Sequence, residues 1–537
     1  MTHELDRRTF LTAASVLGAG AVLASCTGSE DTKASSSSSD DAGSSKAESS
    51  SVSSKADTSS TTFKSSPFTL GVASGDPLPD AVVIWTRLAL EPMDVSKTPA
   101  AEVKVTWEVA ADERFGKIQQ SGSVIASPED AHSVHVDVKK LKPATEIFYR
   151  FKVGTWTSTV GRAKTAPAKD ATPDEVRFGF TSCQDYQTGA YLAHRAMAAD
   201  KLDAVVWLGD YIYEYAPDEK AVRPLSTPAP ADLDGYRNRY GNYKTDVDLQ
   251  GCHASAPWIS IWDDHETQDN YAGLVSENKD TSSEEFTTRR TAAYKAWWEH
   301  MPVRMSKPTG PDLEIYRRLD FGTLMKMVLL DTRQYRDNQA CDASPLDVAV
   351  RCAGVDTDSL LGPTELAWVL DELQSADEVT WCVLAQQIMM GQLQLAEKDP
   401  VLNVDQWDGY RAERQKLLDV MKPNTVVLSG DIHSSWVNDL KIDFDDPSSK
   451  TVATEFVGPP TSSVFPAGFA AILGNAKAIN PHVRYVDSTS HGYGRCTVTA
   501  AKWTTEYRYG DIKDPQGKVT TSKTWTVTPD TPGAIDA

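Results

Sequence analysis

Four apolar runs along the chain each end beside side chains that can bind a metal ion. The runs are FGFTSCQ, VVWLGDYIY, ISIWDDHE and VVLSGDIH, and their β-branched and aromatic residues are typical of buried strands. Open α/β sheets place their chemistry just outside the carboxyl ends of such strands. The pattern therefore predicts that groups far apart in the sequence converge on one metal site.

Residues 67–167 follow a different pattern, in which apolar and polar positions alternate over short segments. The clearest segments are residues 82–88, 103–109, 135–141 and 147–153. Alternation of period two between turn residues is typical of strands in a small β-sandwich. We predict an N-terminal β-sandwich domain over residues 67–167, and we find no catalytic constellation in it.

From about residue 172 onward, predicted strands alternate with predicted helices. Helical spacing of apolar residues appears at 192–200 and 286–300, and strand patterns appear at 325–330, 379–385, 425–428 and 496–509. This alternation predicts an α/β catalytic domain with mixed sheets over residues 172–537.

The first 26 residues have the features of an export signal. Arg7 and Arg8 precede an apolar stretch that ends at Ala24 and is too short for a membrane span of about 20 residues. The segment LASC, ending at Cys26, resembles a bacterial lipoprotein processing site. We predict a twin-arginine lipoprotein signal over residues 1–26, read by the twin-arginine export machinery. The protein is then exported, either held at the extracellular face of the cell membrane by a lipid anchor at Cys26 or secreted.

Residues 27–66 are rich in Ser and almost free of large apolar side chains. Such a segment buries too little apolar surface to offset the entropy of ordering. We therefore predict a disordered linker that tethers the folded body.

Composition narrows the class of protein. A chain of 537 residues that is 40% hydrophobic has room for roughly two or three domains, and we expect a monomer. The formal charge of -21 argues against a nucleic-acid scaffold role, because binding a phosphate backbone needs clustered Lys and Arg. An anionic substrate remains compatible with this charge, since bound cations reverse the local field of carboxylates.

Each motif also has a simpler structural interpretation. Asp210 in GDYIY is placed to cap a helix, and a buried Cys183 is most often an inert core residue. Both side chains nevertheless stand at strand ends, as do the Asp and His residues of DDHE and GDIH. Thiolate, phenolate, carboxylate and imidazole around one ion favour a Lewis-acidic iron over calcium or magnesium.

The remaining cysteines have the character of structural residues. Cys341 and Cys352 are candidates for a loop disulfide outside the cytoplasm. Cys252, Cys382 and Cys496 have no evident partner. His491, in HGYGR, either approaches the metal site or caps a turn.

The order of the motifs resembles a known family. The series FGFTSCQDYQTGAY, WLGDYIYEY, IWDDHETQDN, LLDTRQYR, LAQQIMMG and VVLSGDIHSSW is similar to PhoD-type alkaline phosphatases and the related phospholipase D enzymes of the metallophosphoesterase superfamily. The likeness includes the twin-arginine leader and the β-sandwich. It implies a four-layer α/β/β/α metallophosphoesterase sandwich preceded by a small all-β, fibronectin III-like domain. It also implies a site that holds Fe³⁺ and Ca²⁺ and hydrolyses phosphate monoesters, diesters or both.

The resemblance further implies roles for particular residues. The expected iron ligands are Cys183, Asp210, Tyr213 and His433, with Asp210 also bridging to calcium. The expected ligands of the second metal are Asp264, Asn270 and Asp431. Gln386, where related enzymes carry a His, is a weaker candidate.

A mechanism follows from the charge of the substrate. A phosphate ester repels hydroxide, so the site must neutralise the ester oxygens and supply a nucleophile, which we expect to be a metal-bound hydroxide. We assign catalytic roles to Asp210 and to His265, which is placed to donate a proton to the leaving oxygen or, alternatively, to orient a metal ligand. Several arginines are able to hold phosphate, but we rank none as a site residue: Arg289, Arg290, Arg333 and Arg336.

Two other functions remain open from the sequence alone. One is a phospholipase D-type phosphodiesterase, which differs from a phosphatase in the ester that it cleaves. The other is a surface binding lipoprotein whose metal site is structural. A site with Asp and His ligands and few thiolates favours the open, catalytic kind over the closed, structural kind.

Overall fold

The computed structural model describes residues 63–340, 348–350, 352–395, 401–465, 473 and 477–537. These residues belong to one compact unit, Ser60–Ala537. The predicted export signal with Arg7, Arg8 and Cys26, and almost all of the predicted linker, lie outside the described residues.

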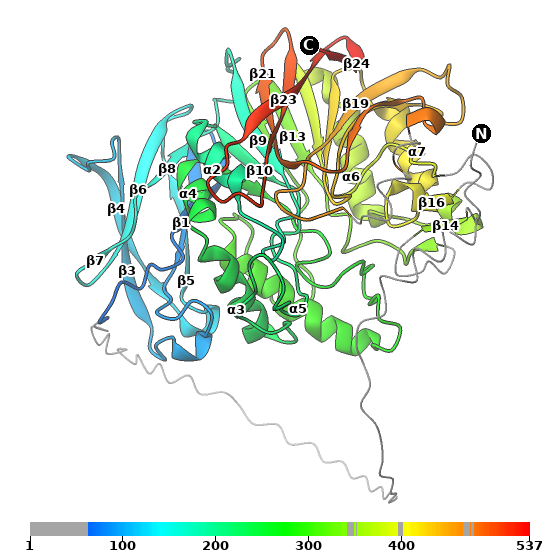
Figure 1. Ribbon diagram of the computed structural model, residues 1–537. Coiled ribbons are helices and arrows are strands. Elements are labelled where there is room, and N and C mark those ends of the chain that lie inside the picture. Colours follow the sequence, from blue (N-terminus) through cyan, green and yellow to red (C-terminus); the bar gives the residue numbers. More distant parts are fainter. Residues whose placement is uncertain (1–62, 341–347, 351, 396–400, 466–472, 474–476) are drawn as a thin grey trace, which may run out of the picture. The chain divides into compact units, whose positions relative to one another are not determined.

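Two large sheets form the centre of the fold (Figure 1). The strand order of the first is β24-β23-β22-β21-β9-β10-β11-β1-β2-β5, and that of the second is β12-β13-β15-β17-β19-β18-β20. The first sheet contains β1 (Val72–Leu78), β2 (Ala81–Arg87), β5 (Ser133–Lys139), β9 (Val176–Thr181), β10 (Ala204–Trp207), β11 (Pro257–Ser260), β21 (His491–Val498), β22 (Trp503–Gly510), β23 (Thr520–Thr528) and β24 (Thr531–Asp536). The second contains β12 (Arg317–Phe321), β13 (Met325–Leu329), β15 (Trp381–Ala385), β17 (Thr425–Ser429), β18 (Ser435–Lys441), β19 (Thr451–Val457) and β20 (Val483–Asp487). Strands β9, β10, β11 and β1 run parallel, as do β13, β15, β17 and β19, so each sheet has one edge where carboxyl ends gather.

The alternation of side chains explains why the sheets stack. On β13, Met325, Met327 and Leu329 pack in the core shared by the two sheets, whereas Val328 packs in a separate core with helix residues. Residues of α6 (Gly362–Gln374) and α7 (Arg411–Val420) complete that second core. Helices α2 (Leu192–Ala199) and α4 (Val247–Ser255) cover the first sheet (Figure 1). A four-layer α/β/β/α arrangement results, which confirms the predicted fold class.

Gly179 on β9 shows how closely this cover approaches. A Cβ atom there would lie 2.8 Å from the sulfur of Met197 on α2. A side chain at this position would therefore push α2 away from the sheet. The flanking residue Phe180 turns the other way, toward Gly458 at the end of β19.

The N-terminal strands form a β-sandwich that shares the large sheet. One layer contains β3 (Val103–Ala110), β4 (Ile118–Ala126), β6 (Glu146–Val153), β7 (Trp156–Thr157) and β8 (Gly161–Lys164). The other layer is β1, β2 and β5, and the apolar side chains of both layers form one core. Because β1 pairs in parallel with β11, the sandwich continues the catalytic sheet (Figure 1). The four strands predicted here correspond to β2, β3, β5 and β6.

Further helices lie beside the sheets. They are α3 (Leu233–Lys244) and α5 (Ser283–His300). A separate two-stranded sheet pairs β14 (Val348–Val350) with β16 (Val401–Asn403). Short 3₁₀ turns are η1 (Val95–Lys97), η2 (Pro128–Asp130), η4 (Ala353–Asp356), η5 (Ala376–Glu378) and η6 (Trp407–Gly409). Helix α5 begins three residues before its predicted start because Ser282 and Glu285 form a capping box. No helix in the described parts of the chain has the length and apolarity that crossing a membrane requires.

Candidate metal centre

The predicted ligands lie in the loops that follow parallel strands of both sheets. Cys183 follows β9, Asp210 follows β10, and Asp264 follows β11 in the first sheet. Asp431 and His433 follow β17 in the second. The structure brings these side chains together, because the two sheets present their carboxyl ends at the same place.

The backbone at these positions is strained. Twelve non-glycine residues in the described parts of the chain have a positive φ, and five of them are predicted ligands: Cys183, Asp210, Asn270, Asp431 and His433, with φ between 49° and 62°. Such conformations are costly for residues with a Cβ and persist where the surrounding structure over-determines them, often at functional sites. Position 209 requires glycine for a similar reason, since its φ is 116° and an added Cβ would lie 2.4 Å from the Cβ of Asp263.

One group of side chains fits the predicted iron site. Ligand atoms of Cys183, Asp210 and His433 all lie within 4.8 Å of one another. The Tyr213 hydroxyl donates to Asp210 Oδ2 at 2.9 Å and lies 2.9 Å from His433 Nε2. Ser463 Oγ donates to the same hydroxyl at 2.8 Å. Thiol, phenol, carboxyl and imidazole therefore converge on one point, as the sequence predicts.

Burial controls the protonation of this group. It raises the pKa of the Cys183 thiol and of the Tyr213 hydroxyl, and the neighbouring Asp210 carboxyl raises both further. Burial also lowers the pKa of His433 to about 4, which keeps its imidazole in the neutral form that binds metals. Anionic forms of the thiol and phenol are costly here unless a cation lies among them.

A second group of carboxylates lies beside the first. Ligand atoms of Asp210, Asp264 and His265 lie within 4.8 Å of one another, and so do those of Asp263, Asp264 and Asp431. Asp210 Oδ1, Asp263 Oδ2 and Asp264 Oδ1 are buried and accept no hydrogen bond. Buried carboxylate oxygens without donors are rare in folded proteins, and hard oxygen atoms are the ligands that calcium prefers. The residues present therefore fit a second cation.

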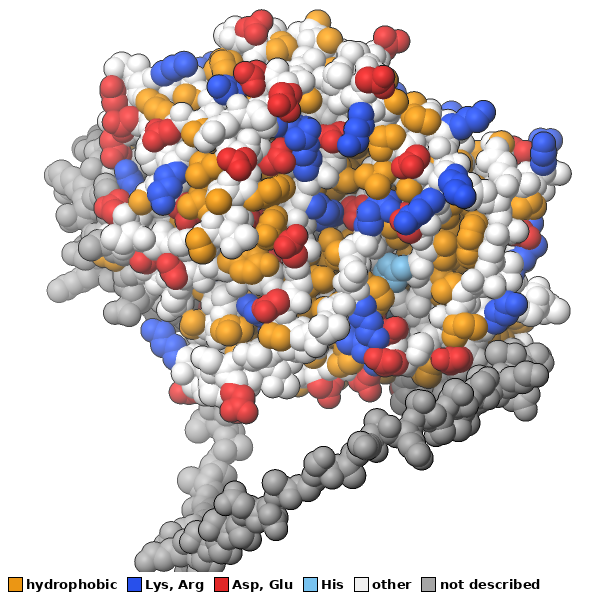
Figure 2. Space-filling model, turned by 180° about the vertical axis from the view of Figure 1, so that it is seen from behind, with side chains coloured by type: hydrophobic (Ala, Val, Ile, Leu, Met, Phe, Trp, Pro, Cys, Tyr) orange, Lys and Arg blue, Asp and Glu red, His pale blue; other side chains and the backbone are white. Residues whose placement is uncertain are grey.

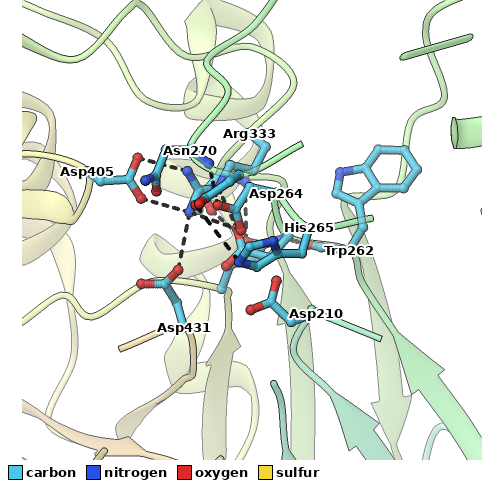
Figure 3. A network of polar contacts seen from close by, with 12 residues as sticks. Asp210, Trp262, Asp264, His265, Asn270, Arg333, Asp405 and Asp431 are labelled. Carbon is cyan, nitrogen blue, oxygen red and sulfur yellow. Dashed lines mark hydrogen bonds and ion pairs between the residues drawn. The ribbon is translucent and has the colours of Figure 1, made fainter. Parts of the chain in front are cut away.

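Arg333 stands among these carboxylates, which corrects our sequence-based ranking of the arginines (Figure 3). Its Nε donates to Asp263 Oδ1 at 2.5 Å, Nη1 donates to Asp405 Oδ1 at 2.8 Å, and Nη2 donates to Asp431 Oδ1 at 3.3 Å. The signal was present in the sequence, because LLDTR follows β13 in the way that the other motifs follow their strands. Arg289 and Arg290 instead donate to Tyr236 and Asp312.

His265 is held by a residue that the sequence did not single out. Its Nδ1 lies 2.8 Å from Glu214 Oε2, and its ring centroid lies 4.0 Å from that of Tyr213. Burial by itself lowers the pKa of His265, but Glu214, Asp264 and Asp210 outweigh burial and raise it. Glu214 follows Asp210 by four residues in GDYIYEY, so the same motif supplies the partner.

The remaining candidates separate into two kinds. Asn270 lies in the site, where its backbone N–H donates to Asp264 Oδ2 at 2.6 Å (Figure 3). Gln386 does not contribute, because its amide nitrogen donates to Ser429 Oγ at 3.1 Å and its oxygen accepts from Trp407 Nε1 at 2.6 Å. Its weaker candidacy is therefore wrong.

The other cysteines are structural where the structure describes them. Cys252, Cys382 and Cys496 are buried free thiols, as predicted. Cys352 is disulfide-bonded, while its predicted partner Cys341 lies outside the described residues.

A hollow of about 850 Å³ lies beside the loop that carries Ser463, and none of the candidate iron ligands lines it. Val464 and His491 both line it. The backbone of Val464 contacts the His433 ring, and the backbone of Ser463 contacts the His491 ring. His491 thus contacts the loop whose Ser463 donates to Tyr213.

The surface turned away from the view of Figure 1 carries mixed charge. Acidic and basic side chains are interspersed over it (Figure 2). On this face the charge of the chain is not gathered into one patch, whereas five aspartates gather at the metal centre: Asp210, Asp263, Asp264, Asp405 and Asp431.

Family models match most of the chain. Residues 178–507 match the model of the PhoD-like phosphatase, and residues 52–167 match the model of the PhoD-like phosphatase N-terminal domain. The two matches fall on either side of the boundary that we predict between the β-sandwich and the catalytic domain.

Similar proteins include enzymes and solved structures. Alkaline phosphatase D of Bacillus subtilis (strain 168) is 43% identical over 458 residues, which are 83% of this chain and 78% of the relative. A solved structure of PhoD superposes with a TM-score of 0.84 at 40% identity and covers 89% of this chain and 93% of that one. Purple acid phosphatase PPD1 from yellow lupin (Lupinus luteus) seeds, at 11% identity and a TM-score of 0.54 over 85% of this chain and 73% of that one, shares the fold.

Proposed function

The chain belongs to the PhoD-like phosphatase family and is a phosphoesterase, and from that premise we propose that it is an exported, metal-dependent hydrolase of phosphate esters. Membership of an enzyme family weighs against a binding lipoprotein with a purely structural metal site. We further propose that the site holds ferric iron and calcium and that phosphate monoesters are its first substrate class.

One observation carries this proposal. Cys183, Asp210, Tyr213 and His433 converge beside carboxylate oxygens of Asp210 and Asp264 that accept no hydrogen bond. Soft and aromatic donors on one side favour iron, and hard oxygens on the other favour calcium. A single carboxylate, Asp210, belongs to both groups and would be shared by the two cations.

The chemistry divides between the cations and the chain. When bound, the cations neutralise the ester oxygens and make water a nucleophile near neutral pH. Cys183, Tyr213 and His433 would hold the iron, and Asp264, Asn270 and Asp431 would hold the calcium. The hydrogen bonds of 2.8 to 2.9 Å around Tyr213 hold these ligands in place before substrate arrives, so little reorganisation is needed during the reaction.

His265 acts as the proton donor to the leaving alcohol. Glu214 accepts the hydrogen bond from Nδ1, which orients the ring and leaves Nε2 to hold a proton. That proton passes from Nε2 to the leaving oxygen as the phosphorus–oxygen bond breaks. Contact with the Tyr213 ring, at 4.0 Å between centroids and a tilt of 33°, keeps the imidazole next to the ligand group.

Phosphodiester hydrolysis is a second candidate activity, and the hollow beside His433 favours it. A monoester needs room only for phosphate and one alcohol, whereas a diester carries a second alcohol group. The hollow of about 850 Å³ offers that room at a place where Val464 contacts His433.

The test is hydrolysis of p-nitrophenyl phosphate and of bis(p-nitrophenyl) phosphate by the purified full-length protein. An Asp210→Asn variant purified in parallel controls for contaminating phosphatases. We expect nitrophenol release by the wild type that the variant lacks. Equal release by both proteins, or none by a wild type loaded with iron and calcium, contradicts the proposal.

Export is tested separately from chemistry. The twin-arginine route carries folded proteins, which suits an enzyme that binds its metals before export. We expect Arg7→Lys with Arg8→Lys to leave the protein in the cytoplasm, and Cys26→Ala to release it from the membrane fraction. Unchanged membrane association of Cys26→Ala contradicts the lipid anchor.

A further inference from the structure

Arg333 makes unequal contacts with the acidic side chains around it. The residue has no exposed surface, so its charge is compensated only by neighbours. Its closest contacts are to Asp263 Oδ1 at 2.5 Å and to both oxygens of Asp405 at 2.8 Å. Its contacts to the candidate calcium ligands are longer, 3.3 Å to Asp431 and 3.7 Å to Asp264 (Figure 3).

We propose that Arg333 is the positioning residue of the second cation site: it holds Asp405 and Oδ1 of Asp263, so that Asp264 Oδ1 and Asp263 Oδ2 stay open to a divalent cation. The inference rests on the proposed function, which places calcium at Asp264. Arg333 touches neither substrate nor water in this scheme. It acts through the carboxylates that it fixes.

The hydrogen bonds of the neighbours support this division of roles. Asp405 Oδ1 accepts from Arg336 at 2.6 Å and from Gln339 at 2.8 Å as well as from Arg333, so it is fully engaged by donors. Asp264 Oδ1 and Asp263 Oδ2, by contrast, accept no hydrogen bond. Asp431 lies between these extremes, because Oδ1 accepts from Arg333 at 3.3 Å and Oδ2 accepts from Gln406. A carboxylate that three donors hold is a poor ligand, whereas one with a free oxygen is a ready one.

Charge explains why a fixed cation is needed in addition to metal. Five aspartates lie in or beside the site, and like charges at such distances repel one another strongly in a buried environment. One guanidinium between them offsets part of this repulsion.

Only an arginine suits the geometry. Its planar fork directs donors at Asp263, Asp405 and Asp431 at the same time, whereas an ammonium group is a single point charge that serves fewer partners. Arg333→Lys therefore keeps the charge and loses the positioning. Arg336→Lys is the matched control, because Arg336 is also buried and binds Asp405 but makes no contact with Asp264 or Asp431 among the described interactions.

The experiment measures calcium affinity rather than activity. Iron-loaded wild type, Arg333→Lys and Arg336→Lys are depleted of calcium and titrated with calcium chloride in a calorimeter. We expect the Kd of Arg333→Lys to rise at least about tenfold, while Arg336→Lys stays within about threefold and all three proteins keep the same iron content. If Arg333→Lys unfolds, Arg333→Gln is titrated with the same expectation.

Two results overturn the inference. One is a calcium Kd in Arg333→Lys, or in Arg333→Gln, that equals or is tighter than that of the wild type. The other is a wild type that binds no calcium. Failure of the wild type to hydrolyse phosphate esters is a different result, which defeats the proposed function and leaves the calcium titration to be judged by itself.

Discussion

Two buried aspartates of the ten-stranded sheet share an unusual backbone but differ in their partners. Asp76 lies on β1 with a φ of 43°, Asp210 follows β10 with a φ of 57°, and each is only 1% exposed. Asp76 is fully satisfied, because Oδ1 accepts from Arg317 at 2.7 Å and Oδ2 accepts from the backbone of Arg304 at 2.9 Å. Asp210 has one satisfied oxygen, and its Oδ1 accepts no hydrogen bond.

The difference teaches which feature marks a functional carboxylate. Strain and burial are common to both residues, so neither identifies the site. An oxygen left without a donor separates Asp210 from Asp76, because a buried polar atom of that kind is costly unless a ligand completes it. Asp76 instead joins the β-sandwich to the body of the protein, since Arg304 and Arg317 lie beyond residue 300.

Neutralising Asp210 is expected to have the largest effect on activity. Asp210→Asn keeps the size of the side chain and removes the charge that both cations share. We expect hydrolysis to fall by at least about three orders of magnitude, on the order of 4 kcal/mol, together with a loss of bound metal. Steady-state kinetics and elemental analysis check it, and retention of activity within tenfold contradicts the bridging role.

Loss of the second cation, or of its ligand Asp431, is expected to have the next largest effect on activity. Asp431→Ala is expected to lower the rate by at least about two orders of magnitude, on the order of 3 kcal/mol. EGTA is expected to abolish hydrolysis by the wild type, and added calcium to restore it. Full activity in EGTA excludes an exchangeable catalytic calcium.

Asp76→Asn, the counterpart of Asp210→Asn, should lower stability without lowering activity. Asp76→Asn leaves Arg317 without its carboxylate, and we expect it to lower the free energy of unfolding by about 2 kcal/mol. Its turnover number should stay within about threefold of the wild type, because Asp76 has no open oxygen. Thermal unfolding checks the loss of stability, and steady-state kinetics check the turnover number. A large loss of turnover with unchanged stability would show that Asp76, too, is a functional carboxylate.

The smallest effect concerns Tyr213. Tyr213→Phe keeps the ring against His265 and removes the ligand oxygen. A phenolate bound to ferric iron absorbs visible light, so the variant should shift or lose that band and slow by about tenfold. Visible spectroscopy checks it, and an identical band in wild type and variant shows that Tyr213 is not a ligand.

The sequence predicted the candidate ligands at the strand ends better than the residues that contact them. Strand ends marked by Cys183, Asp210 and Asp431 were recognisable because the residues before each are apolar or β-branched and the ligand follows directly. Gln386 follows a strand in the same way, yet its amide is satisfied by Ser429 and Trp407. Which strand-end residues face the site depends on tertiary contacts that no local pattern contains.

The contacts of these partners could not be predicted for the same reason, although Arg333 and Glu214 both stand in motifs that the sequence shows. Glu214 binds His265 across 51 residues, and Arg333 binds Asp263 across 70. Asp405 reaches Arg333 from the segment between β16 and α7, where no apolar run points to a site. The shared sheet was also unpredictable, because pairing of β1 with β11 joins residues about 180 positions apart through backbone hydrogen bonds.

The most direct test of the account is the metal content of the protein purified from its exporting cells without chelators. The account predicts about one iron and at least one calcium per chain in a coloured protein that hydrolyses phosphate esters. A colourless protein with full activity and neither metal contradicts the metal assignments, and it would leave Cys183 as an ordinary buried core residue.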